Sequence, residues 1–292
     1  MSLNALWKML IEVYNDWSDD KASRLAAALA FYTILSLAPI LIIVIAIAGF
    51  AFGEPAVREE IAYTMQSLVG EDGAIAIKMV MEHAALPGHS TLAETMGLIV
   101  LLFGAAEVFI QLKDSLNDIW DVKQRFDGGI LATIREYFFS LSMVVGIGFL
   151  LLVSLVVDAA LSAFGAFMGT LIPNNEIFLR AVTFISSFAV ITFLFALIYK
   201  VVPDASVAWS DVWIGAAFTT LLFIAGKILI GLYISYSAEG AAYGAAGSVV
   251  ILMLWVYYSA QIFLMGAEFT KVYAERFGSR IKPDRGIMTM HE

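Results

Sequence analysis

Long and nearly uninterrupted apolar runs recur along this chain of 292 residues. A helix needs about 20 mostly apolar residues to cross the hydrocarbon core of a bilayer. Six runs meet this requirement, at roughly Leu25–Phe52, Thr95–Leu112, Tyr137–Leu161, Leu179–Val202, Val212–Tyr236 and Gly244–Phe269. Because lipid offers the backbone no hydrogen-bond partners, such runs fold as α-helices. The pattern therefore predicts an all-α integral membrane bundle of six transmembrane helices.

Two amphipathic stretches flank the first predicted span. Before it, apolar residues between Leu3 and Trp17 repeat at helical spacing while polar residues fill the opposite face, which is typical of an interfacial helix. After it, residues 53–92 form the sizeable extramembrane segment, with apolar positions spaced for two short helices. The predicted domains are an interfacial helix at 1–20, a six-span membrane domain with this outer helical segment at 21–275, and a tail at 276–292.

The distribution of basic residues predicts the orientation. Lysine and arginine gather in the cytoplasmic connections of membrane proteins. Most of the 17 Lys and Arg residues flank the side that holds both termini, whereas the other side carries only Arg58, Lys78 and Arg180. Both termini are therefore expected in the cytoplasm. An even number of spans agrees with this, because it places both termini on the same side of the membrane. We expect a multi-pass protein of the cytoplasmic membrane.

The composition supports an integral membrane protein and argues against several other classes of protein. The chain is 61% hydrophobic and 15% charged, whereas soluble domains are nearer half apolar and a quarter charged. It has no cysteine, and its net charge of −9 opposes binding to nucleic acid, which is a polyanion. The three histidines match no metal-binding spacing, and no nucleophile–base pair stands out. We therefore expect no catalytic residue, no metal, no cofactor and no nucleic-acid partner.

Ionisable residues at membrane depth are costly, so they are the first candidates for function. Those in or near the predicted spans are Glu107, Asp158, Lys227 and Glu268. In the functional interpretation they face a polar cavity that accepts a solute, an ion or a lipid headgroup. In the structural one, Lys227 snorkels or pairs with Glu107, Asp158 or Glu239. For Glu268, close to Lys271 and to the cytoplasmic boundary, the structural interpretation is favoured.

Two spans carry further polar or conformational features. On the last span, Tyr257 and Gln261 form a polar stripe with Glu268, which fits either the lining of a pathway or interhelical hydrogen bonds. On the first span, Pro39 removes a backbone hydrogen bond and tends to bend the helix, with Tyr32 two turns before it. We interpret Pro39 as a hinge, or else as a kink that helps helices fit together.

Three ordered blocks of sequence resemble a known family. They are SRLAAALAFY at 23–32 with SLAP at 36–39, FIQLKDSLNDIW at 109–120, and YGAAGS at 243–248 with LWVYYSAQ at 254–261 and GAEF at 266–269. Together they resemble the YihY/BrkB membrane protein family over most of residues 20–275. The resemblance implies a six-helix inner-membrane protein and brings no settled catalytic residues. Some relatives carry the label ribonuclease BN, which the acidic chain without a soluble RNA-binding domain or metal-ligand set disfavours.

The preferred hypothesis is a transporter, an exporter or a lipid flippase of the cytoplasmic membrane, working through a polar cavity in the bundle. Its expected partners are membrane lipids and an unknown solute or lipid substrate, and homo-oligomers are left open. The alternative is a non-transporting scaffold or envelope-integrity protein, with a channel and an intramembrane enzyme as further options. A cavity open to lipid or water favours transport, and a closed interior favours a scaffold.

Overall fold

The computed structural model describes residues 3–84, 91–123, 138, 142, 176–236, 247–283 and 288–289. The helices are α1 (Leu3–Asp19), α2 (Ala22–Phe52), α3 (Glu54–Val69), α4 (Glu71–Ala84), α5 (Thr91–Ile119), α7 (Glu176–Val201), α8 (Trp209–Tyr236) and α10 (Gly247–Arg276). The strands, of two residues each, are β1 (Val122–Lys123), β2 (Ala205–Ser206), β3 (Lys282–Pro283) and β4 (Met288–Thr289). The predicted all-α class is therefore confirmed for the described part of the chain.

Four of the described helices are long and apolar enough to cross a membrane. These stretches are Ala22–Phe50 of α2, Phe184–Val201 of α7, Trp209–Leu232 of α8 and Gly247–Arg276 of α10. No more than 33% of any of these stretches is buried inside the protein. Most of their apolar side chains therefore face outward, where a lipid environment covers them without the cost of hydrating apolar surface.

The count of six spans stays a prediction. The second predicted span lies within α5, whose 29 residues extend about 43 Å at about 1.5 Å per residue, enough to cross a bilayer. The third predicted span, Tyr137–Leu161, lies outside the described residues except for Phe138 and Ser142.

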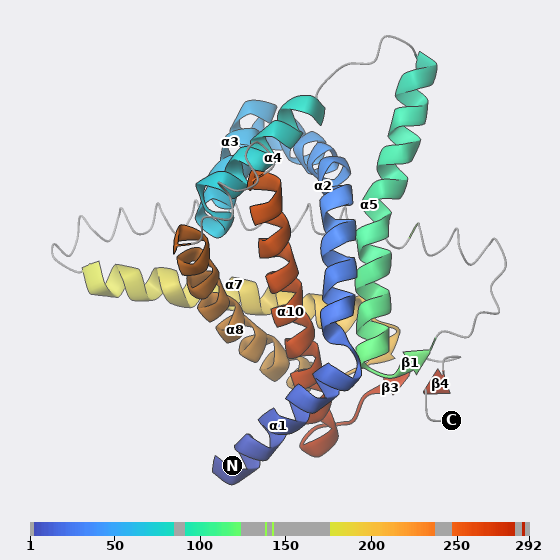
Figure 1. The fold of residues 1–292 in the computed structure, drawn as a ribbon, viewed down its shortest axis with the longest axis vertical. Helices are drawn as coiled ribbons and strands as arrows, with labels where there is room; N and C mark the ends of the chain where they lie inside the picture. The colour runs from blue at the N-terminus through green and yellow to red at the C-terminus, as the bar shows by residue number, and fades with distance from the viewer. Residues whose placement is uncertain are drawn as a thin grey trace.

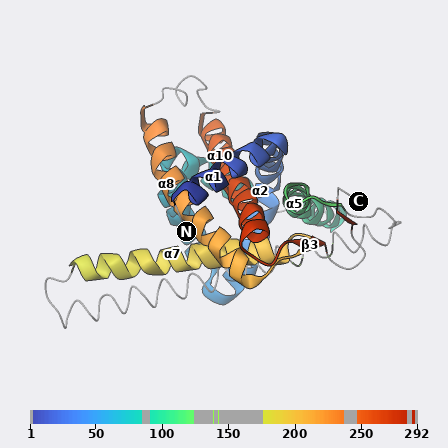
Figure 2. The same cartoon turned by 90° about the horizontal axis from the view of Figure 1, so that it is seen from below.

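The long helices do not form a simple parallel bundle. Helix α2 contacts both α5 and α10, and these three run along the long axis of the molecule (Figure 1). Helix α8 packs against α10 and α7, whereas α7 crosses the direction of the other long helices (Figures 1 and 2). A buried apolar cluster joins these helices and includes Leu116, Trp120, Tyr199, Val212 and Leu264.

Helices α8 and α10 approach closely at two glycines. A Cβ atom at Gly215 would overlap the hydroxyl of Thr270, and a Cβ atom at Gly266 would overlap the hydroxyl of Thr219. Tyr199 of α7 closes this contact, because its hydroxyl donates to the carbonyl of Phe263 at 2.7 Å. Small residues at helix crossings allow such close packing in membrane proteins.

Helix α1 has the amphipathic character that its sequence predicts. Met9 and Val13 on one face pack against Phe269 and Val272 of α10. The chain then turns sharply into α2 at Lys21, which has a left-handed φ of 53°. Large apolar side chains elsewhere on α1 remain exposed, namely Trp7, Leu10, Ile11 and Tyr14. This exposed apolar surface suits a helix that lies against a membrane interface.

The segment after α2 folds as the two predicted helices. Helices α3 and α4 form a hairpin at the end of the structure away from α1 (Figure 1). The hairpin packs on α2 and α10. The buried residues of this contact are Leu41, Ile45, Ala48, Val57, Ala76, Ile77, Met81 and Leu252.

The predicted tail folds back onto the end of the molecule that carries α1. Strand β3 pairs antiparallel with β2 and places Lys282 opposite Ser206. Strand β4 pairs antiparallel with β1 and places Met288 opposite Lys123. The periodicity of the sequence contains no signal for two-residue strands, because alternation over two residues cannot be distinguished from chance.

Candidate functional site

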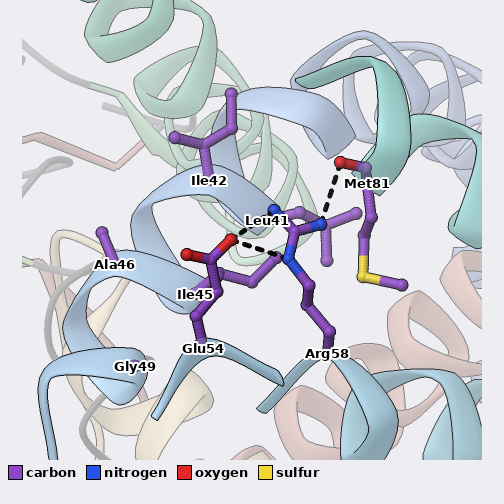
Figure 3. A pocket seen from close by; sticks show the side chains of 8 residues that line it. All are labelled: Leu41, Ile42, Ile45, Ala46, Gly49, Glu54, Arg58 and Met81. Atoms are coloured by element: carbon purple, nitrogen blue, oxygen red, sulfur yellow. Dashed lines mark hydrogen bonds and ion pairs between the residues drawn. The ribbon is translucent and has the colours of Figure 1, made fainter. Parts of the chain in front are cut away.

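A pocket of about 360 Å³ lies between α2 and the α3–α4 hairpin (Figure 3). We call it the α2–α3 pocket. Its lining residues are Leu41, Ile42, Ile45, Ala46, Gly49, Glu54, Arg58 and Met81. The volume falls within the range of about 300–1,000 Å³ that is usual for small-molecule sites.

One wall of the α2–α3 pocket is an apolar face of α2. Its residues recur at intervals of three and four from Leu41 to Gly49, which places them on one side of the helix. This stretch belongs to the part of α2 that is apolar enough to cross a membrane. At the end of the wall, a Cβ atom on Gly49 would lie only 3.3 Å from the Cα of Glu54, so glycine lets α3 begin close to α2. The apolar wall therefore belongs to a stretch that is long and apolar enough to cross a membrane.

The opposite side of the pocket carries a guanidinium–carboxylate pair (Figure 3). The Nε of Arg58 donates to Oε1 of Glu54 at 2.8 Å, and Nη2 lies 2.7 Å from the same oxygen. Nη1 donates to the backbone carbonyl of Met81 at 3.0 Å, which ties α3 to α4. The Arg58 side chain is 28% exposed and that of Glu54 is 59% exposed. The guanidinium of Arg58 is thus held in the pocket wall, whereas the carboxylate of Glu54 is largely exposed.

This arrangement offers the two kinds of contact that bind an amphiphile, an apolar surface and a charged group. The α2 wall offers apolar contact for a chain, and Arg58 offers hydrogen bonds and positive charge for an anionic headgroup. Among the described residues, the three contacts of Arg58 use three of its five N–H donors. A phosphate or carboxylate could bind the remaining donors, and Glu54 is exposed enough to move aside.

A second polar site lies at the opposite end of the bundle, near α1. Glu268 of α10 is completely buried, and among the described residues neither of its carboxyl oxygens has a hydrogen-bond partner. Lys271, one turn further on, lies with its Nζ 2.6 Å from Oδ2 of Asp121 and 3.6 Å from Oδ2 of Asp20. Asp16 of α1 also interacts with Glu268 and Lys271. We call Asp16, Asp20, Asp121 and Glu268 around Lys271 the carboxyl cluster.

Burial changes the titration of one carboxyl in this cluster that lies outside the spans. It raises the pKa of Asp16 above its ordinary value, against the opposing effect of the Lys271 ammonium. The neighbouring carboxyls of Asp20, Asp19 and Asp121 raise the pKa further. Folding therefore makes the Asp16 carboxyl hold its proton more tightly.

A network beside the carboxyl cluster fixes the end of α5. Lys113 Nζ lies 2.9 Å from Oδ2 of Asp204, and Asn117 Nδ2 donates to the same oxygen at 3.1 Å. The backbone N–H of Asp204 donates to Oδ1 of Asn117 at 2.9 Å. Trp120 Nε1 donates to the carbonyl of Ala267 at 3.1 Å. The block at 109–120 therefore positions α5 against the loop after α7 and against α10.

The comparison with known families identifies the kind of protein. The family model described as "Virulence factor BrkB" matches residues 13–286. The chain belongs to the BrkB family. This confirms the resemblance drawn from the three sequence blocks.

Members of this family with curated names are described mainly as membrane proteins. The chain is 29% identical over 265 residues to a UPF0761 membrane protein of Alteromonas mediterranea, covering 90% of this chain and 86% of the relative. It is 23% identical over 271 residues to the "Putative ribonuclease-like protein YfkH" of Bacillus subtilis, covering 91% and 95%. A UPF0761 membrane protein of Pseudomonas aeruginosa is 27% identical, with 85% and 58% covered. No solved structure matches the chain. The family and the apolar helices together establish a membrane protein.

The residues singled out in the sequence of this BrkB-family protein do not converge on one site. None of them lines the α2–α3 pocket. Glu107 is half-buried in α5 and is engaged in an interaction. Lys227 is exposed on α8, which favours the interpretation of a snorkelling lysine. Asp158 and Glu239, two of the predicted partners of Lys227, lie outside the described residues.

The candidate residues of the first and last predicted spans lie on α2 and α10, in different surroundings. Tyr32 is half-buried on α2, and Pro39 packs closely against α5, where a Cβ atom on Gly104 would lie 3.2 Å from its Cγ. Tyr257 packs against the main apolar cluster, and the Oε1 atom of Gln261 is buried without a hydrogen-bond partner among the described residues. Glu268, further along the same helix, lies among the other carboxyls of the cluster and beside Lys271.

Sequence reasoning identified Glu268 beside Lys271, but it missed the Arg58–Glu54 pair and the other carboxyls of the cluster. Arg58 and Glu54 belong to the predicted outer segment, and the sequence did not single them out as a pair. Their spacing of four residues on a helix nevertheless predicts an ion pair. Asp20 and Asp121 lie about a hundred residues apart, in turns that end α1 and α5. No local pattern signals that two such turns meet at Lys271.

Proposed function

We propose that this BrkB-family protein is a transporter of the cytoplasmic membrane that moves amphiphilic molecules with an anionic headgroup, as an exporter or a lipid flippase does. The observation that carries the proposal is the α2–α3 pocket. It joins an apolar wall, in a stretch apolar enough to cross a membrane, to a cation at one end. The proposal includes no catalytic step and no cofactor.

The position of the pocket fits this role. With both termini in the cytoplasm, as the basic residues predict, the α3–α4 hairpin lies on the outer side of the membrane. The α2 wall then faces the outer half of the bilayer, and Arg58 lies near the level of the headgroups. Because guanidinium groups bind phosphate through paired hydrogen bonds, Arg58 is suited to hold a lipid phosphate.

Helix α2, which contains the first predicted span, also offers a way to change the pocket. Pro39 lies two residues before Leu41, at the start of the pocket wall. Proline lacks a backbone N–H and removes one hydrogen bond from its helix, which makes bending there easier. A bend at Pro39 would move the apolar wall relative to Arg58, which is fixed to α4 through the carbonyl of Met81.

The test uses purified protein in liposomes that contain acyl-labelled fluorescent phosphatidylglycerol. Dithionite quenches the probe in the outer leaflet, and the rate of further quenching reports movement between leaflets. Ala46 is exposed in the pocket wall, so Ala46→Trp fills the pocket without overpacking a core, and Arg58→Gln removes the cation. We expect each change to slow movement about tenfold, which corresponds to about 1.4 kcal/mol.

Two matched variants serve as controls. Ala225→Trp adds the same side chain at an exposed position of α8, and Lys78→Gln removes an exposed cation of α4. Both are expected to keep the rate of the unaltered protein. Folding of all variants is checked by circular dichroism and gel filtration. The proposal is refuted if the unaltered protein moves no probe, or if folded Ala46→Trp and Arg58→Gln both move it at the full rate.

A further inference from the structure

The carboxyl cluster contains more negative groups than one lysine can neutralise. It brings four carboxyls together around Lys271. The ammonium of Lys271 is already close to Asp121, at 2.6 Å, and more distant from Asp20, at 3.6 Å. An ionised carboxylate that is removed from water without a partner costs several kcal/mol, on the order of the stability of a whole domain. Glu268, the fully buried member of the cluster, therefore needs a further positive charge beside it.

The geometry shows where this charge belongs. Glu268 is completely buried, and its two oxygens meet no hydrogen-bond donor among the described residues. Its side-chain neighbour is another carboxyl, that of Asp20. Ionised carboxylates only accept hydrogen bonds, so two facing carboxyls form a bond only when one of them carries a proton. One shared proton satisfies both groups and removes the repulsion between them.

The charged groups that act on Glu268 come from α1, from the turn between α1 and α2, and from α10 itself. Helix α1 contributes Asp16, the turn between α1 and α2 contributes Asp20, and α10 itself contributes Lys271. Asp121, in the turn after α5, is bound to Lys271. One turn further along α10, Arg276 pairs with Glu12 of α1. Among the described residues, the cations in these contacts are Lys271 and Arg276, and both already contact carboxylates.

The cluster also reaches water. The side chain of Asp20 is 25% exposed and that of Asp121 is 27% exposed, although Glu268 is fully buried. Asp20 therefore links the buried carboxyl to the aqueous side that holds α1. A proton can pass between Glu268 and water through Asp20 without any large rearrangement of the bundle.

We propose that Glu268 and Asp20 form a proton-binding site that takes up and releases one proton on the side of the membrane that holds α1. Uptake joins the proton to the buried carboxyl of Glu268, and Asp20 accepts its hydrogen bond. Release passes the proton to water and leaves two facing carboxylates, which repel. Because Glu268 belongs to α10 and Asp20 leads into α2, the protonation state controls how closely these two helices approach at this end. This site goes beyond the proposed transport of amphiphiles and does not depend on it.

The test uses the hydrophobic reagent dicyclohexylcarbodiimide on the full chain in detergent. The reagent adds to a protonated carboxyl in apolar surroundings, and the modified residue is located by peptide mass spectrometry. We expect modification at Glu268 at neutral pH. Once the shared proton is lost at alkaline pH, modification should fall by about tenfold for each pH unit. Glu268→Gln should abolish it, whereas Glu82→Gln, at an exposed carboxyl of α4, should leave it unchanged.

A second measurement does not depend on any variant folding. Infrared spectroscopy of the unaltered protein detects the carbonyl stretch of a protonated carboxylic acid, and this band should disappear in alkaline buffer. Absence of the band at neutral pH would overturn the proposal. So would a folded protein in which Glu268 does not react with the reagent. Neither readout involves lipid movement, so the proton site and the proposed transport are tested separately.

Discussion

Replacing Gly266 by alanine tests the close contact between α8 and α10. In most exposed helix positions this substitution is favourable, by about 1 kcal/mol, because glycine loses more backbone freedom on folding. At Gly266 the added Cβ would overlap the hydroxyls of Thr219 and Tyr199, and it would lie 2.8 Å from the Cβ of Thr219. The Cβ of Thr219 is fixed by the backbone, so α8 and α10 must move apart.

The magnitude follows from the contacts that this movement breaks. Overpacking of a well-packed contact costs about 1–3 kcal/mol. The hydroxyl of Tyr199 lies 2.7 Å from the carbonyl of Phe263 and 3.0 Å from Oγ1 of Thr219, and such interhelical bonds contribute about 0.6 kcal/mol each. These losses exceed the gain in helix propensity, which leaves a net destabilisation of about 1–3 kcal/mol.

Gly231 on α8 is the matched control. It is exposed, and a Cβ atom there would meet nothing within 4 Å, so Gly231→Ala should be neutral or stabilising by up to about 1 kcal/mol. Unfolding in mixed micelles of dodecyl sulfate can be followed by the fluorescence of the six tryptophans. The reasoning fails if Gly266→Ala is as stable as the unaltered protein.

Two further predictions concern the end of the molecule near α1. Asp204→Asn removes the carboxylate that Lys113 and Asn117 share. Because Lys113 is almost fully buried, we expect the free energy of unfolding to fall by about 3 kcal/mol in the same assay. A fall no larger than that caused by an Asp→Asn change at an exposed position would contradict this prediction. Because burial raises the pKa of Asp16, the folded state holds this proton more tightly than the unfolded state, so stability falls as pH rises from the ordinary value of 3.8 through the raised pKa. Asp16→Asn should therefore be more stable than the unaltered protein near neutral pH and show a flatter dependence of melting temperature on pH; parallel curves would disprove this assignment.

Much of the fold follows from the sequence alone, because hydrophobicity and helical periodicity are local properties. The apolar stretches in α2, α7, α8 and α10 are read directly from runs of about 20 apolar residues. The amphipathic helix α1 and the two helices α3 and α4 follow from apolar positions at intervals of three and four. Three short blocks were enough to indicate the BrkB family.

Only the tertiary structure decided which polar groups meet. The sequence indicated that Glu268 and Lys271 lie close together, since they are one turn apart, but not that Asp20 and Asp121 join them. Likewise, the sequence left open whether Lys227 faces a cavity, snorkels or pairs with a carboxylate, and in the structure the rotation of α8 leaves it exposed. The direction a side chain faces depends on how a helix is rotated against its neighbours, and in an almost uniformly apolar helix no periodic pattern encodes that rotation. The α2–α3 pocket depends in the same way on the packing of three helices, which no single stretch of the chain determines.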